Sequence, residues 1–179
     1  LSRGTATTKK QVRKLVRAGG GGEDDWMRLQ GQVYGARMQD AVLIDGVSNF
    51  LERCRDHRHE VLIISHKTEF GHFDEARVNL REAAYGWMMA QGFFDEMRYG
   101  LDPASVFFEP TRTEKVARIK STDCTHFIDD LVEVFEEPGF PPETIRMLYA
   151  VDAVETADKP YATFGSWHEI ADEILGNSN

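Results

Sequence analysis

From residue 41 onward, short apolar runs alternate with amphipathic segments, and this alternation restricts the possible folds more than any other feature of the chain. Each apolar run is long enough for one buried strand, and the segments between the runs have apolar residues at helical spacing. The runs expected to form strands are 59–66, 105–109, 125–129 and 145–150. Strands that alternate with helices predict a parallel sheet covered by helices on both faces. The sequence therefore predicts a Rossmann-like α/β fold for this part of the chain.

The segments between and after these strands are predicted to form helices or helical turns. They are 46–57, 74–92, 111–121, 130–137 and 167–175. The first helix has four apolar side chains on one face, which we expect to pack into the core. They are Val47, Phe50, Leu51 and Cys54. Either Thr111 or Thr113 is expected to cap the helix at 111–121.

Residues 1–40 differ from the rest, and they are predicted to form a small helical segment in front of an α/β core over 41–179. The first 20 residues hold six Lys or Arg side chains and no acid. Within them, 7–18 has the spacing of a short basic helix, and the four glycines at 19–22 are expected to end it.

A second N-terminal helix is predicted over 23–38. Asp24 or Asp25 is expected to cap it, because a carboxylate is favourable at a helix N-terminus. Its apolar residues recur at helical spacing and are expected to point inward. These residues are Trp26, Leu29 and Val33.

Charge and composition exclude several classes of function. The formal net charge is −9 at pH 7, which argues against general nucleic-acid binding. No apolar run approaches the roughly 20 residues of a membrane span, so no membrane association is expected. The only two cysteines, Cys54 and Cys124, are too few for a disulfide framework. A reducing, cytoplasmic location is therefore predicted.

The most conspicuous polar residues lie at the carboxyl ends of predicted strands. Ser65 ends the first apolar run, and the adjacent carboxylates Asp129 and Asp130 end the third. Lys115 lies near the start of the helix that precedes this third run. Ligands of open parallel sheets bind beyond the carboxyl ends of the strands, so these side chains are candidates for one site.

Together these residue types suit the binding of a phosphoryl group and its metal ion. Two adjacent carboxylates repel each other unless a cation lies between them, and Mg²⁺ prefers carboxylate oxygens and water. Asp129 and Asp130 are therefore the predicted metal ligands. Ser65 would donate a hydrogen bond to a phosphoryl oxygen, and Lys115 would neutralise charge that develops in the transition state.

Three motifs, "EVLIISHK", "TRTEKVARI" and "THFIDDLVEV", resemble motifs two, three and four of the haloacid dehalogenase-like phosphohydrolases in type and order. In that family the motifs are a Ser or Thr ending a strand, a Lys at a helix start, and an acid pair ending a strand. Ser65, Lys115, Asp129 and Asp130 match them. The resemblance covers about residues 41–175. It implies Mg²⁺-dependent hydrolysis of a small phosphorylated metabolite, with the N-terminal helices as a cap.

The chain departs from that family at motif one, a strand ending in Asp-x-Asp that supplies the nucleophile. No Asp-x-Asp occurs in the 179 residues. We expect this strand upstream of Leu1, in which case the 179 residues alone are inactive. As an alternative, residues 41–46 take its place with Asp45 at the tip, although the residue two positions on is Val47 and not an acid.

Other interpretations stay open from the sequence. A protein with this site but no nucleophile would bind a ligand or partner without catalysis, and a receiver-like domain would be phosphorylated on Asp129 or Asp130. The same two carboxylates also suit the capping of the following turn. His66 and Lys67 follow Ser65 directly and are placed to touch a substrate.

Overall fold

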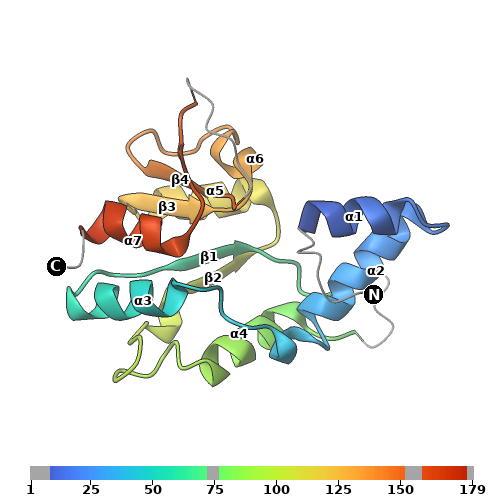
Figure 1. Cartoon of the computed structure of the whole chain (residues 1–179), viewed down its shortest axis with the longest axis horizontal. Coiled ribbons are helices and arrows are strands. Elements are labelled where there is room, and N and C mark those ends of the chain that lie inside the picture. The colour runs from blue at the N-terminus through green and yellow to red at the C-terminus, as the bar shows by residue number, and fades with distance from the viewer. Residues whose placement is uncertain (1–8, 72–76, 152–158, 177–179) are drawn as a thin grey trace. The chain divides into compact units, whose positions relative to one another are not determined.

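The computed structural model describes residues 9–71, 77–151 and 159–176, and helices and strands alternate along most of the chain (Figure 1). The helices are α1 (Lys9–Arg17), α2 (Gly22–Tyr34), α3 (Val47–Asp56), α4 (Leu80–Ala90), α5 (Arg112–Ser121), α6 (Val132–Phe135) and α7 (Trp167–Leu175). The strands are β1 (Ile63–His66), β2 (Val106–Glu109), β3 (His126–Asp129), β4 (Ile145–Tyr149) and β5 (Ala162–Phe164). Two short 3-10 helices are η1 (Met38–Asp40) and η2 (Pro103–Ser105).

Two compact units make up the chain. Unit one contains Leu1–Ala41 and Glu69–Trp87, and unit two contains Val42–Thr68 and Met88–Asn179. The sequence predicted one continuous core over 41–179, which includes the segment from Glu69 to Trp87. In the structure this segment belongs to unit one, so each unit consists of two separate stretches of the chain. The predicted helix over 74–92 is shorter in the structure, where α4 begins at Leu80. Its first predicted residues, 74–76, lie outside the described residues.

In unit one, the basic helix α1 packs against α2. Arg13 and Arg17 both form ion pairs with Glu23 in the first turn of α2. The Arg13 guanidinium also lies over the ring of the buried Trp26, 5.8 Å from its centroid. The positive charge of α1 is therefore partly neutralised by the neighbouring helix.

The predicted cap of α2 is wrong. Gly21 is the N-cap, and Asp24 and Asp25 lie inside the first turn. They still favour the helix, because a negative charge near a helix N-terminus opposes the positive end of the helix dipole.

The predicted inward face of α2 is only partly correct. Trp26 is buried, but Val33 is 47% exposed. Gly31 and Gly35 are buried instead, and a Cβ on Gly35 would come within 2.6 Å of the Gly31 carbonyl oxygen and 3.2 Å of Leu80. The closely packed side of α2 is thus a glycine side, which hydrophobic spacing does not reveal.

Unit two contains two parallel sheets, β1–β2 and β3–β4–β5. Ser65 lies opposite Phe108 in the first, and Asp129 lies opposite Leu148 in the second. The structure confirms an α/β fold with parallel strands, whereas the sequence predicted one sheet. Strand β5 was not predicted, because three residues are too few for a clear apolar alternation.

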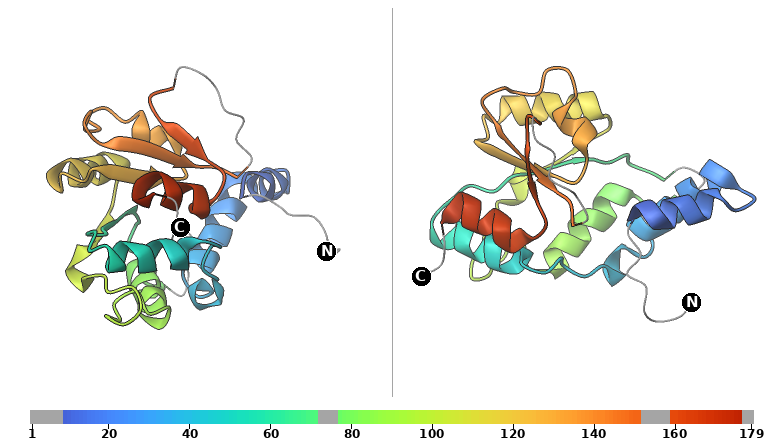
Figure 2. Two further views of the ribbon diagram at one scale, coloured as in Figure 1. Left: turned by 60° about the vertical axis from the view of Figure 1, so that its left-hand side comes forward. Right: turned by 45° about the horizontal axis from the view of Figure 1, so that its top comes forward.

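The core of unit two joins both sheets with the helices that cover them. Its buried residues are Ile64, Val116, Ile119, Val134, Phe135, Phe140, Leu148 and Tyr161. Helices α3 and α7 also pack against each other, as both views of Figure 2 show. All four residues predicted on the inner face of α3 are buried, so that prediction is confirmed.

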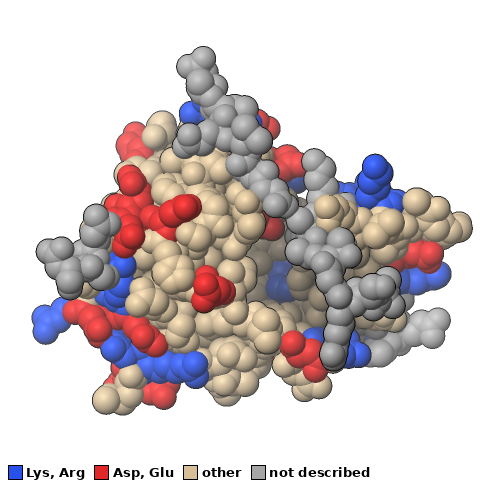
Figure 3. All heavy atoms as spheres, in the orientation of Figure 1, with Lys and Arg blue, Asp and Glu red and all other residues tan. Residues whose placement is uncertain are grey.

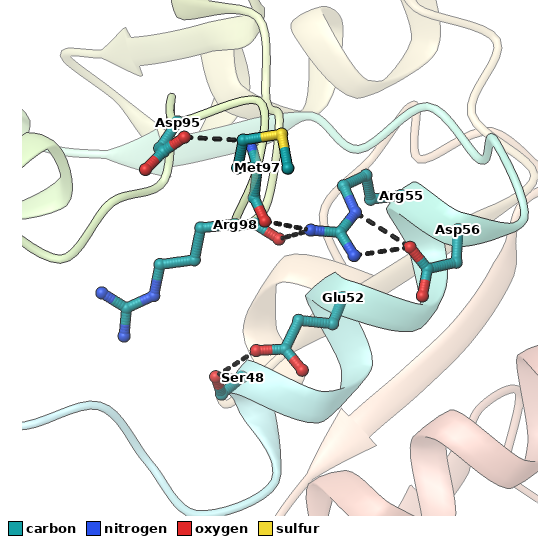
Figure 4. A network of polar contacts seen from close by, with 7 residues as sticks. All are labelled: Ser48, Glu52, Arg55, Asp56, Asp95, Met97 and Arg98. Atoms are coloured by element: carbon teal, nitrogen blue, oxygen red, sulfur yellow. Dashed lines mark hydrogen bonds and ion pairs between the residues drawn. The ribbon is translucent and has the colours of Figure 1, made fainter.

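Arg55 ties the segment that leads into β2 to helix α3 (Figure 4). Its guanidinium donates hydrogen bonds to the carbonyl oxygens of Met97, at 2.6 Å, and Arg98. Two turns earlier in α3, the Ser48 hydroxyl lies 2.7 Å from the hydroxyl of the buried Tyr99. Because α3 precedes β1 and the bound segment precedes β2, these contacts hold the entrances of both strands together.

Both signs of charge occur on the face of the molecule drawn in Figure 3. On the face drawn in Figure 3, Lys and Arg side chains form separate groups among Asp and Glu, with no continuous basic area over its described part. This agrees with the net charge of −9. Within the described stretches, no helix has both the length and the apolar character needed to cross a membrane.

Burial raises the pKa of the Cys54 thiol to about 11, an effect that the neighbouring Arg53 charge only partly opposes. Because the folded pKa lies above the unfolded value of 9.0, this thiol favours folding below pH 9, and the benefit is lost as the pH rises toward 11. At pH 8 we expect Cys54 to react with iodoacetamide about 100-fold more slowly in the folded chain than in urea.

Mass spectrometry of the alkylated peptides, sampled over time, measures this difference for Cys54 directly. The Cys124→Ser variant removes the second thiol as a control. Equal rates for folded and unfolded Cys54 would contradict the prediction.

Candidate functional site

The carboxyl ends of β1 and β2 lie at one edge, because the two strands are parallel and in register. His66, the last residue of β1, has its Nε2 atom 3.1 Å from the Pro110 carbonyl oxygen. The next residue, Lys67, donates its backbone N–H to the Glu109 carbonyl oxygen at 2.9 Å. These two contacts fix the start of α5, which follows Pro110 closely, beside the end of β1.

Thr111 caps α5, and it is one of the two residues that the sequence predicted for this cap. Its hydroxyl oxygen accepts a hydrogen bond from the Glu114 backbone N–H at 3.1 Å and donates to the Glu114 carboxylate at 2.6 Å. This cap fixes the residue at which the helix begins. It therefore also fixes the position from which Lys115, the residue after Glu114, projects.

The Thr111→Ala variant is expected to lower the free energy of unfolding by about 1 kcal/mol, because the first turn of α5 loses its side-chain acceptor. Urea denaturation followed by circular dichroism measures the change. Thr111→Ser keeps the hydroxyl and is the matched control, with little expected change. A similar loss in both variants would show that the cap is not the cause.

Lys115 and Asp129 form a buried ion pair between α5 and the end of β3. The Lys115 ammonium contacts Oδ2 of Asp129, and the two side chains are only 9% and 5% exposed. The ammonium also lies 5.3 Å from the centroid of the Phe127 ring. Asp129 Oδ1 accepts a hydrogen bond from the Leu131 backbone N–H at 2.9 Å. Each buried charge therefore has a partner, which is the condition for burying an ion at all.

Asp129 and Asp130 have different environments although they are adjacent. Asp129 is buried and accepts a hydrogen bond from the backbone N–H of Leu131, the N-cap residue of α6. No side chain caps α6 itself, so the capping role that the sequence left open is not confirmed. Asp130 is exposed. The acid pair thus offers one carboxylate fixed by the protein and one that faces solvent.

Two polar residues, Ser65 in β1 and Lys67 directly after it, lie at the end of this strand. Ser65 is partly buried, and none of the described residues forms a hydrogen bond with its hydroxyl. Burial lowers the pKa of the Lys67 ammonium, because a poorly solvated cation is less stable. Such a cation attracts an anion more strongly than a fully hydrated one does.

The structure places Ser65, Lys115 and Asp129 at the same end of the strands. Ser65 lies near the carboxyl end of β1, beside which α5 starts, and Lys115 near the start of α5 contacts the last residue of β3. Sequence reasoning assigned Asp129 to a metal and Lys115 to a substrate. It missed that the two bind each other, because a contact between side chains 14 residues apart depends on how α5 packs against β3.

Asp45 does not stand at the tip of a strand, as the alternative for residues 41–46 required. Residues 41–44 form neither helix nor strand, and Val42 and Ile44 are 84% and 50% exposed. Asp45 is therefore not at a strand end, and the alternative that residues 41–46 form the first strand of the sheet is wrong.

Metal binding at this site would have to rely on few protein ligands. Among the described residues, no group of three or more His, Cys, Asp or Glu side chains is arranged to hold a metal ion. Mg²⁺ commonly binds through one or two carboxylates plus waters and substrate phosphates. The exposed Asp130 carboxylate and the remaining lone pairs of Asp129 are donors of that kind, so the residues present fit this mode of binding.

No family model, no curated protein and no solved structure matches the chain. The function is therefore inferred from the residues of the site and their surroundings.

Proposed function

We propose that this chain is the phosphoryl-binding core of a Mg²⁺-dependent phosphohydrolase of the haloacid dehalogenase type that acts on a small phosphorylated metabolite. The Lys115–Asp129 pair supports this most strongly. It lies at the carboxyl ends of parallel strands, the usual position of ligands in such sheets. Ser65, whose hydroxyl has no hydrogen-bond partner among the described residues, lies near the carboxyl end of β1.

Each residue has a distinct role in this proposal. Ser65 donates a hydrogen bond to a non-bridging phosphoryl oxygen. Lys115 is held by Asp129 close to the strand ends, and it neutralises negative charge as that charge develops on the phosphoryl group. Asp130 and Asp129 would hold Mg²⁺, which when bound supplies further positive charge to the phosphoryl oxygens.

The covalent step requires one further aspartate. Its carboxylate oxygen would form a bond to phosphorus while the bond from phosphorus to the leaving alcohol breaks, and water would then cleave the aspartyl phosphate to release inorganic phosphate. Two of the described strands end in an acid, and both acids are paired: Glu109 of β2 binds Arg118, and Asp129 of β3 binds Lys115. The proposed nucleophile therefore comes from polypeptide outside these strands.

A second candidate function is the binding of a phosphorylated ligand without turnover. Both carboxylate oxygens of Asp129 already have partners, the Lys115 ammonium and the Leu131 backbone N–H, and this favours binding without turnover. In either case we propose a cytoplasmic protein, since both cysteines are free thiols.

Two measurements test these functions. The first is calorimetric titration of the 179-residue chain with inorganic phosphate, in buffer that contains either Mg²⁺ or EDTA. It tests the phosphoryl site that both candidates share, and binding that requires Mg²⁺ is expected. A colorimetric assay of phosphate release from a panel of phosphorylated metabolites, with protein made from the whole reading frame, tests turnover. Binding without release would leave only the second candidate, and the absence of binding would overturn both.

A further inference from the structure

Two histidines, His57 and His59, lie together where helix α3 of unit two ends. Their ring centroids are 6.3 Å apart, and the two ring planes are inclined to each other by 35°. Both residues are exposed, and none of the described residues forms a hydrogen bond with either imidazole. The ring nitrogens are therefore accessible to a ligand from solvent. Imidazole is the commonest side-chain ligand of metal ions in proteins.

The backbone that carries the two rings is fixed by the end of the helix. His59 donates its N–H to the Cys54 carbonyl oxygen at 2.8 Å, and Arg58 donates its N–H to the Arg55 carbonyl oxygen at 2.9 Å. These two hydrogen bonds form a Schellman motif, which requires a left-handed residue directly after the C-cap. Arg58 takes that conformation, with a φ of 60°, and His57 is the C-cap. The histidines thus occupy set positions of a hydrogen-bonded turn.

The separation of the two rings suits a single metal ion between them. With a metal–nitrogen distance of about 2.0–2.1 Å and each nitrogen about 1.1 Å from its ring centre, two imidazoles that share an ion have centroids about 5.2 Å apart at a tetrahedral angle and about 6.4 Å apart when they lie opposite each other. The observed 6.3 Å falls within this range. Exposed side chains change rotamer within nanoseconds, so the rings can close the difference of about 1 Å when an ion binds.

The charges around the pair permit the binding of a cation. The C-terminal end of α3 carries the negative end of the helix dipole. Arg55 in the last turn binds Asp56 and two backbone carbonyl oxygens (Figure 4), and Arg53 pairs with an acid of α7. Arg58 and Glu60, both exposed, carry opposite charges on either side of His59. The described ionic groups next to the pair therefore nearly balance, and the helix end favours a positive ion.

The pair is separate from the candidate phosphoryl site. His59 precedes Ile63, the first residue of β1, whereas Ser65 and Lys67 lie at the carboxyl end of that strand. The donor atoms also differ, since Mg²⁺ prefers oxygen ligands and imidazole nitrogen suits Zn²⁺, Cu²⁺ and Ni²⁺. An ion bound by the histidines would therefore be a second ion of another chemical class.

We propose that His57 and His59 of one chain chelate a single divalent transition-metal ion, with water in its other coordination positions. Among the described residues no third His, Cys, Asp or Glu side chain completes the group. The site is therefore open and exchangeable, unlike the closed four-ligand sites that hold structural zinc. Of the divalent ions of the first transition row, Cu²⁺ binds nitrogen ligands most tightly and is the most sensitive probe.

The inference does not rest on the proposed function, and it is tested by adding Cu²⁺ to the 179-residue chain. Electron paramagnetic resonance counts the bound nitrogens through their hyperfine splitting, and titration gives the affinity and the stoichiometry. The expected result is that the tightest site holds one ion per chain with two imidazole nitrogens. An excess of Mg²⁺ should leave both the spectrum and the affinity unchanged.

Substitution of each histidine tests the chelate directly. His57→Gln and His59→Gln should each weaken the site about tenfold or more and leave one nitrogen ligand, because the second imidazole no longer binds intramolecularly. Both side chains are exposed, so thermal melts without metal should match that of the unchanged chain. His168→Gln removes an exposed histidine of α7 and is the matched control, with no expected effect. Arg58→Gly keeps the left-handed conformation and should retain both nitrogen ligands.

Several outcomes would overturn the proposal. They are a single nitrogen at the tightest site of the unchanged chain, full affinity in either His57→Gln or His59→Gln, and equal weakening by His168→Gln. One ion for every two chains would indicate a bridge between copies and would also overturn it. A chain that chelates Cu²⁺ as expected but never binds inorganic phosphate would sustain this inference and overturn the proposed function.

Discussion

Under the proposed function, the Asp130→Asn variant is expected to lose Mg²⁺-dependent phosphate release by about 10²–10³-fold, the usual cost of removing one charge-stabilising group from an active site. Asp130 is exposed, so the amide fits without rearrangement and the protein should stay folded. The assay is phosphate release by the protein made from the whole reading frame, with and without Mg²⁺. In the 179-residue chain, the same variant should weaken the Mg²⁺-dependent affinity for inorganic phosphate.

Glu133 supplies the matched control, because it is another exposed acid one turn further on. The Glu133→Gln variant removes the same charge and should leave both readouts unchanged. A thermal melt of each variant separates loss of chemistry from loss of fold. Undiminished release by Asp130→Asn would remove the acid pair from the mechanism.

The Lys115→Met variant is expected to lower the free energy of unfolding by about 3–5 kcal/mol, because it leaves the Asp129 carboxylate buried without a cation. Methionine fills a similar volume, so most of the loss is electrostatic. Urea denaturation monitored by tryptophan fluorescence measures it. The exposed pair of Arg37 and Asp40 is the control, and Arg37→Met should cost less than about 1 kcal/mol.

A double-mutant cycle identifies the origin of the Lys115 effect. Asp129→Asn removes the charge but keeps the oxygen that accepts from Leu131. The combined Lys115→Met, Asp129→Asn variant is therefore expected to recover at least about half of the stability lost in Lys115→Met. If the two losses simply add, the pair does not interact as the structure shows.

Elements set by local spacing were predicted well from the sequence. The inner face of α3 and the Thr111 cap of α5 each depend on residues within about one or two turns, and the structure confirms both. Tertiary features were predicted poorly. The division into two sheets depends on which strands find neighbours, and the glycine side of α2 depends on the approach of Leu80 from a distant segment.

The same distinction applies to the candidate site. Ser65, Asp129 and Asp130 were placed at the carboxyl ends of strands, because a strand end is visible in the sequence as the end of an apolar run. The burial of Asp129 beside Lys115, and the contrast with the exposed Asp130, were not predicted. Both follow from the packing of α5 over the strands, which no local pattern encodes.

The discontinuous make-up of unit one has a practical consequence for dissecting the protein. The stretch 69–87 belongs to the same unit as the N-terminal helices, and Leu80 meets Gly35 there. Deleting the first 41 residues alone would therefore strip Leu80 of its neighbours and expose an apolar surface prone to aggregation. A clean excision of unit one takes two deletions, of 1–41 and of 69–87, with a short linker joining Thr68 to Met88. It also shortens α4 to the few residues that belong to unit two.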